Sequence, residues 1–142
     1  MSVDIRQAPD SSMELVGNAS TGGGGFVAAT INYTASTVDS TFFVADRAYV
    51  VKAIRSRVDV AGTGGACTAQ IRKTATATAP ASGTVLHTGS HNLVGTANAN
   101  QQLTLSTTAS DLLLAVGDAL SYDLTGTATS AVGSITVTLA PA

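Results

Sequence analysis

The sequence has no tryptophan, a single cysteine and few charged side chains. Aromatic residues make up 4% of its 142 residues and charged residues 11%, against about 25% charged in a typical soluble domain. A core built from this composition must use valine, isoleucine and leucine, with few large anchors. The lone Cys67 excludes an intramolecular disulfide, and we expect it to pack as a small apolar side chain within a strand.

Long apolar segments are also missing. No run approaches the roughly 20 apolar residues that a membrane-spanning helix needs. The N-terminal MSVDIRQAPD lacks the apolar core of a signal peptide. We therefore expect a protein that is made in a cytosol and has no membrane partner.

The few charges are scattered, with a formal net charge of -2. No basic stripe is present, which excludes the electrostatic footprint of a nucleic-acid-binding protein. Two explanations of so neutral a surface stay open. Neighbouring subunits cover part of it, or serine and threonine hydroxyls keep it soluble.

Motifs for catalysis are absent. The sequence contains no phosphate loop, dinucleotide fingerprint or zinc-type CxxC pair. The glycine run Gly22–Gly25 lacks the Lys-Ser/Thr that completes a phosphate loop, and it precedes a predicted strand rather than a helix. A glycosidase would need two carboxylates facing a cleft, and such clefts commonly carry aromatic platforms that this chain lacks. We expect neither an enzyme nor a cofactor.

Two histidines, His87 and His91, lie in the segment LHTGSH. A spacing of four places side chains on one face only in a helix, whereas Gly89 and the flanking residues favour a strand, a turn and a second strand. We predict that both histidines lie on the surface of a hairpin and bind no metal, because no third ligand is nearby. Asp118, which follows Gly117, is predicted to fix a tight turn.

Short β-type segments follow one another from Phe26 to the end of the chain. Alternating apolar and polar residues predict about eight strands separated by turn signals. They lie at 26–33, 41–45, 48–62, 67–73, 84–89, 100–106, 118–126 and 133–142. Only the segment 108–116 has a helical alternative. The pattern predicts an all-β protein, an antiparallel β-sandwich of jelly-roll-like form, formed by residues 26–142.

The longest strand signal, 48–62, alternates clearly. Val50, Ile54, Val58 and Val60 share one parity and are predicted to face the core. Arg55 and Arg57 share the other parity with Asp59. The two arginines lie either on a solvent-exposed face or in a subunit interface.

We expect residues 1–25 to form a separate N-terminal arm with a glycine hinge, Gly22, Gly23, Gly24 and Gly25. Glycine runs behave as flexible coil, and the short apolar patch Met13, Leu15 and Val16 suggests an anchor that docks on another surface. An ordinary disordered terminus and an edge strand of the same domain are the alternatives.

Several segments together resemble a known family. They are AYVVKAIRSRVDVAGTGGACTAQIRK, ASGTVLHTG, LTLSTTASDLLLAVGDALSYDLTGT and GSITVTLAP. They resemble small structural proteins of tailed bacteriophages that decorate or cement the capsid exterior, some of which form head fibres. The resemblance implies a non-enzymatic virion protein, often a homotrimer, that is assembled in the host cytoplasm and binds the major capsid protein.

In that setting the arm is expected to contact the shell or a neighbouring subunit through Ile5, Arg6, Met13, Leu15 and Val16. The alternative is a tail or fibre module that binds a host receptor or glycan, against which the scarcity of aromatic residues argues.

Overall fold

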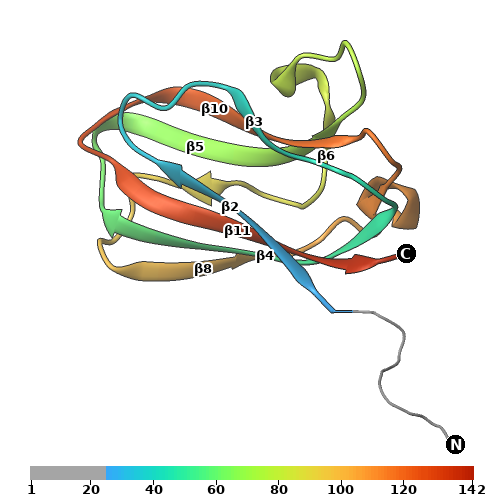
Figure 1. The fold of residues 1–142 in the computed structure, drawn as a ribbon. Helices are drawn as coiled ribbons and strands as arrows, with labels where there is room; N and C mark the ends of the chain where they lie inside the picture. Colours follow the sequence, from blue (N-terminus) through green and yellow to red (C-terminus); the bar gives the residue numbers. More distant parts are fainter. Residues whose placement is uncertain (1–24) are drawn as a thin grey trace, which may run out of the picture.

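Two antiparallel β-sheets face each other in the computed structural model, which describes residues 25–142 (Figure 1). The β4 sheet has the order β2 (Val27–Tyr33), β11 (Val132–Pro141), β4 (Tyr49–Val60) and β8 (Ala99–Leu103), and β9 (Leu113–Leu114) also pairs with β4. The β5 sheet has the order β3 (Ser40–Val44), β10 (Ala119–Thr129), β5 (Thr63–Thr74) and β6 (Thr84–Val85), and β7 (His91–Asn92) also pairs with β5. The predicted antiparallel β-sandwich is confirmed.

The strands pair as nested hairpins. β2 pairs with β11, β3 with β10, β4 with β8 and β5 with β6, so the first described strand lies beside the last. In a jelly roll, the first strand pairs with the last, the second with the next to last, and so on, and the pairs are divided between two sheets. The strands from β2 to β11 follow this arrangement. The sequence predicted this class of fold but not which strands are neighbours.

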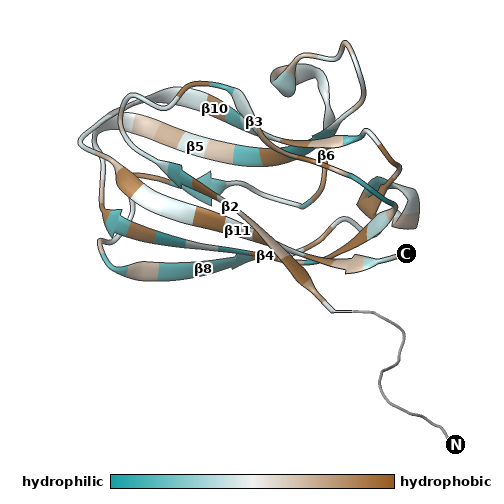
Figure 2. Cartoon of the chain, viewed as in Figure 1, coloured by the Kyte–Doolittle hydropathy of each residue, from teal (hydrophilic) through white to brown (hydrophobic). Residues whose placement is uncertain are grey.

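Hydrophobic and hydrophilic residues alternate along several strands (Figure 2), and the hydrophobic ones that are buried form the core between the sheets. Ile135, Val137 and Leu139 of β11 are completely buried, and Ile71 of β5 and Leu120 of β10 meet them from the opposite sheet. Burying each such side chain contributes about 1.5–3 kcal/mol. Aliphatic residues make up most of the core, and Tyr33 and Tyr122 are the largest side chains that are completely buried in it.

The predicted core face of β4 is correct over only part of its length. Ile54 and Val58 are buried, but Val50 is half-buried and Val60 is 46% exposed. The pairing with β11 passes from Ala53 directly to Val51, so Lys52 is the extra residue of a β-bulge. The bulge reverses the parity of the strand and turns Val51, rather than Val50, into the core.

The segment 108–116 contains no α-helix. It forms a 3-10 helix, η3 (Ala109–Leu112), and then the short strand β9. A second 3-10 helix, η2 (Pro80–Ser82), lies in the loop between β5 and β6.

The turn before β10 depends on Asp118, as predicted. Its carboxylate Oδ2 accepts a hydrogen bond from the backbone N–H of Ala115 at 2.9 Å. Its own N–H donates to the Ala115 carbonyl at 3.0 Å, and Gly117 between them has a φ of 88°. The side chain therefore closes a turn whose backbone already requires glycine.

We expect Asp118→Ala to lower the free energy of unfolding by about 1 kcal/mol, because the Ala115 N–H loses its partner. Asp118→Asn keeps an acceptor oxygen and is expected to stay within about 0.5 kcal/mol of the unchanged protein. Urea denaturation followed by circular dichroism measures both. Equal losses for the two variants would show that the side-chain oxygen does not hold the turn.

Candidate interaction face

The outer surface of the β4 sheet is polar across all four main strands. Two rows of side chains cross it at right angles to the strands. They are Asn32, Ser134, Arg57 and Asn100, and Thr30, Thr136, Arg55 and Gln102. Since neighbouring strands lie about 4.8 Å apart, each row is about 14 Å long. We call these eight residues the polar face.

Arg57 is held in place by hydrogen bonds. Its Nη1 donates to the Asn98 carbonyl at 3.1 Å and to Asn100 Oδ1 at 3.0 Å, and its Nη2 donates to Asn98 Oδ1 at 3.2 Å. Its Nε donates to Asp59 Oδ1 at 3.0 Å. Asn98 has a φ of 61°, a left-handed conformation that asparagine tolerates and that lets it contact Arg57 through both its carbonyl and its side chain.

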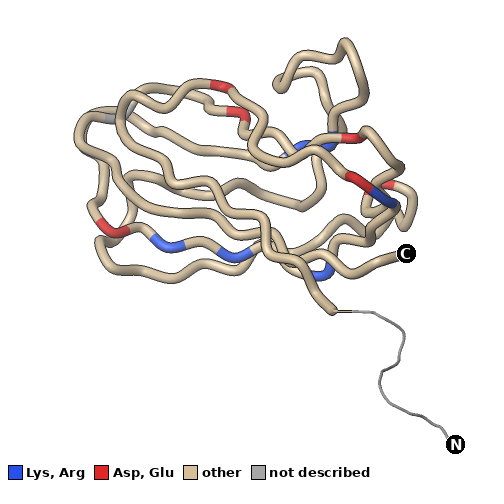
Figure 3. Tube along the Cα trace, viewed as in Figure 1, with Lys and Arg blue, Asp and Glu red and all other residues tan. Residues whose placement is uncertain are grey.

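Arg55 differs from Arg57. It is exposed, and no hydrogen bond or ion pair to it is found among residues 25–142. All four charged residues on the strands of the β4 sheet lie on β4 itself: Lys52, Arg55, Arg57 and Asp59. Figure 3 shows the basic ones spaced along this strand. The sheet is therefore locally positive, although the whole chain has a net charge of -2.

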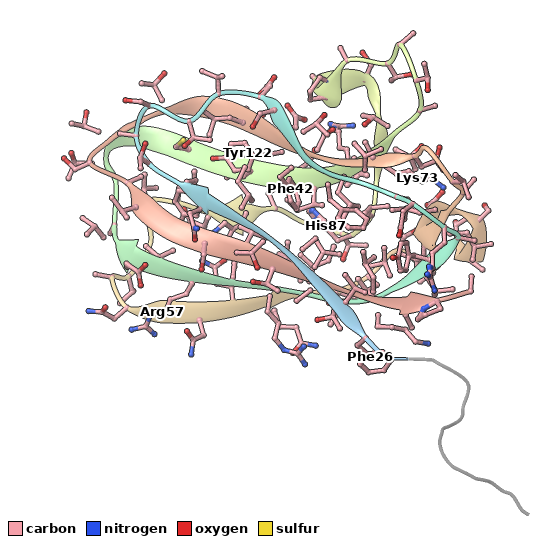
Figure 4. The ribbon with its side chains drawn as sticks, in the orientation of Figure 1. Phe26, Phe42, Arg57, Lys73, His87 and Tyr122 are labelled. Carbon is pink, nitrogen blue, oxygen red and sulfur yellow. The ribbon has the colours of Figure 1, made fainter. Side chains whose placement is uncertain are left out.

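A groove of about 460 Å³ lies on this face. Its lining includes both arginines, together with Asn100, Gln102, Ser134 and Thr136. Figure 4 shows Arg57 at the outside of the β4 sheet, pointing away from the core. The sequence therefore placed the two arginines correctly on the side of the strand opposite the core.

On the outer surface of the β5 sheet, several polar side chains bind one another or nearby backbone groups. Arg72 Nε donates to Asp123 Oδ2 at 2.6 Å and its Nη1 donates to the Gly83 carbonyl at 2.8 Å. The Ser121 hydroxyl hydrogen-bonds those of Thr41 and Thr74 at 3.0 and 2.9 Å, and η2 packs over β5 and β10. Arg72, Asp123 and Ser121 on this surface are therefore paired, whereas Arg55 on the polar face has no hydrogen-bond or ionic partner among residues 25–142.

The prediction that His87 and His91 lie on a surface hairpin is wrong. They are 5% and 0% exposed. His91 lies between the sheets, with Nδ1 at 2.8 Å from Ser56 Oγ and Nε2 at 3.3 Å from the Tyr33 hydroxyl. Polar partners from β4 and β2 allow this ring to be buried. No local pattern could predict them, because they lie 35 and 58 residues away in the sequence.

His87 is held separately. Its Nε2 accepts a hydrogen bond from the backbone N–H of Ile71 at 2.9 Å, so that nitrogen carries no proton. Burial lowers the pKa of His87, and it lowers the pKa of His91 from 6.5 to about 4. Both rings are therefore neutral at pH 7.

Cys67 packs in β5, as predicted, and is buried and unbridged. Burial raises the pKa of its thiol, which removes the thiolate that a nucleophile would need. Within residues 25–142, no three His, Cys, Asp or Glu side chains come together as metal ligands. The helices of this region are all too short to span a membrane.

Most of the predicted arm lies outside the described residues. This applies to Ile5, Arg6, Met13, Leu15 and Val16 and to Gly22, Gly23 and Gly24. Gly25, the last residue of the predicted hinge, is exposed and lies two residues before β2.

Comparison with known proteins gives a likeness in structure only. No protein-family model and no curated protein matches the sequence. The fold is similar to a chain of the capsid asymmetric unit of cyanophage Pam1, with a TM-score of 0.51 and 17% identity over 99% of this chain and 94% of that one. A chain in the structure of infectious bursal disease virus, Gx strain, aligns with a TM-score of 0.35 and 17% identity over 81% of this chain and 31% of that one. At this identity the first likeness concerns the fold alone, and the second has too low a score to add to it.

Proposed function

We propose that this protein is a non-enzymatic structural component of a phage virion that decorates and stabilises the outside of the capsid. The observation that carries the proposal is the jelly-roll likeness, over nearly the whole of both chains, to a component of a phage capsid. The sequence segments that resemble phage decoration proteins support it independently. The proposed partners are the major capsid protein and further copies of this chain, assembled as a homotrimer.

The end of the sandwich where the arm joins is the proposed shell-facing side. β2 begins there, beside the start of β4 and the end of β11. Four apolar side chains at this end, Phe26, Val44, Leu113 and Val116, are between 47% and 69% exposed. We propose that these exposed apolar residues contribute to the contact with the shell.

The arm would extend this contact. Ordering a flexible residue costs roughly 1–2 kcal/mol, so an arm that docks needs apolar anchors to offset that cost. Met13, Leu15 and Val16 would supply about 1.5–3 kcal/mol each if fully buried. The glycine hinge would allow one arm to fit both a fixed oligomer and a variable shell surface.

The test measures binding of the full-length protein to purified heads that lack it. We expect a trimer by native mass spectrometry that sediments with the heads. A variant with Met13, Leu15 and Val16 all changed to serine should lose most of this binding, because the arm loses its apolar anchors. Val38→Ser is the matched control, since Val38 is exposed at the opposite end of the sandwich.

Two results would contradict the proposal. Full binding by the triple variant would remove the arm from the mechanism. A monomer that does not bind heads but binds host cells would favour the alternative, a tail or fibre module that recognises a receptor.

A further inference from the structure

We infer that the polar face of the β4 sheet is a binding site for an acidic polysaccharide, a sugar polymer that carries carboxylates. This inference does not depend on capsid attachment, because a protein on a head or on a fibre presents the same sheet. It rests on three observations: Arg55 has no acidic partner in the part of the chain that the structure describes, Arg57 beside it is held in place, and its neighbours are polar.

Arg55 is the anion-binding group. Its guanidinium is exposed, lines the groove and has no acidic partner among the described residues. The planar fork of an arginine matches a carboxylate with two parallel hydrogen bonds. Arg57, two residues along the same strand, is already bound by Asn98, Asn100 and Asp59. It therefore forms a fixed wall of the groove, and its charge is offset by Asp59.

The neighbours of Arg55 suit hydroxyl groups. Gln102 and Thr136 lie directly beside it in the register of the sheet, and each offers both a donor and an acceptor. The groove volume, about 460 Å³, is within the 300–1,000 Å³ range of small-molecule sites. A sugar ring with a carboxylate and several hydroxyls matches this set of groups.

A protein partner fits the face less well. None of the eight side chains of the polar face is apolar, whereas the buried centre of a protein interface is about 65% apolar and holds aromatic or aliphatic anchors. Neutral sugars also fit less well, because their sites use aromatic rings for stacking and the face has none. The polar face therefore selects a ligand that is recognised by charge and hydrogen bonds.

The experiment measures binding of the full chain to polygalacturonate by isothermal titration calorimetry at low salt. Dextran serves as the neutral polymer and polyglutamate as the acidic polymer without sugar. We expect binding to polygalacturonate that weakens as salt is added, with much weaker binding to both other polymers. Arg55→Gln should weaken binding about 10- to 100-fold, the loss expected for a charge-assisted pair of hydrogen bonds.

Arg47→Gln is the matched control. It removes the same charge from an exposed loop residue that is not part of the polar face, and it should leave binding unchanged. Equal weakening by the two variants would show attraction to net charge rather than a site and would overturn the inference. So would equal affinity for polyglutamate, or the absence of binding to polygalacturonate at low salt. A second copy of the chain bound through this face, detected as an Arg55-dependent oligomer, would assign it to a subunit interface instead.

Discussion

Lowering the pH from 7 to 4 is expected to reduce the free energy of unfolding by about 3 kcal/mol through His91 alone. Burial lowers the pKa of His91 in the folded protein to about 4, whereas in the unfolded chain it returns to about 6.5. Between these values the unfolded chain takes up a proton that the folded protein does not. The stability is therefore fully present above pH 6.5 and is lost as the pH falls toward 4. About 2 kcal/mol of the loss should appear by pH 5, before most carboxylates titrate.

The measurement is urea denaturation at pH 7, 6 and 5, with His91 followed by NMR. His87 must be assigned separately, because its pKa is also lowered and its charge acts on His91. Protonation of His87 Nε2 would also remove the acceptor of the Ile71 N–H bond, so both rings act in the same direction. The variant His91→Gln removes one titrating group and should flatten the pH dependence even if it is less stable overall. An imidazole signal from His91 that titrates near pH 6.5 would contradict the expected burial effect.

Gly133→Ala is expected to destabilise the sandwich by about 3 kcal/mol. A Cβ at this position would meet the backbone oxygen of Arg57 and the hydroxyl of Tyr33. Neither neighbour is free to move. Arg57 is paired in the ladder between β11 and β8, and the Tyr33 ring packs against Tyr122, with ring centres 6.3 Å apart, and against His91 at 5.7 Å. Glycine is therefore required here for close approach.

Gly65→Ala is the control, since a Cβ there meets nothing within 4 Å. It should change stability by no more than about 0.5 kcal/mol. Removing the Tyr33 hydroxyl should relieve part of the crowding, so Gly133→Ala combined with Tyr33→Phe should cost less than the two changes added together. Strict additivity by chemical denaturation would show that Tyr33 does not limit the space at Gly133.

Local patterns in the sequence correctly predicted the features that depend on residues close together in the chain, namely which side of a strand a residue faces and where a turn lies. The alternation in 133–142 placed Ile135, Val137 and Leu139 in the core, and the same reasoning placed Arg55 and Arg57 on the outer surface. Gly117 and Asp118 indicated a turn, which is also a short-range feature. In each case the structure is decided within a few residues of the chain.

The predictions were wrong where the structure depends on residues far apart in the sequence. The bulge at Lys52 depends on how β4 meets β11, and no local signal distinguishes it from a regular strand. The burial of His91 depends on Ser56 and Tyr33, which reach it from other strands. The groove beside Arg55 likewise exists only because β8 and β11 bring Gln102 and Thr136 to either side of β4. The residue types alone indicated that Arg55 is exposed, but they did not indicate that a groove lies beside it.

The nested pairing of the strands also has a consequence for how the chain folds. Among residues 25–142, β2 has β11 as its only ladder partner, and it cannot pair with β11 until synthesis has reached Leu139, because Val27 pairs with Leu139. Contacts this far apart in sequence are slow to form. On the ribosome, β4 and β5 therefore emerge long before the sheets can close, with apolar faces uncovered. Removing residues 132–142 should leave β2 and β4 without the strand between them, so such a truncated chain is expected to aggregate during synthesis rather than to fold with one strand missing.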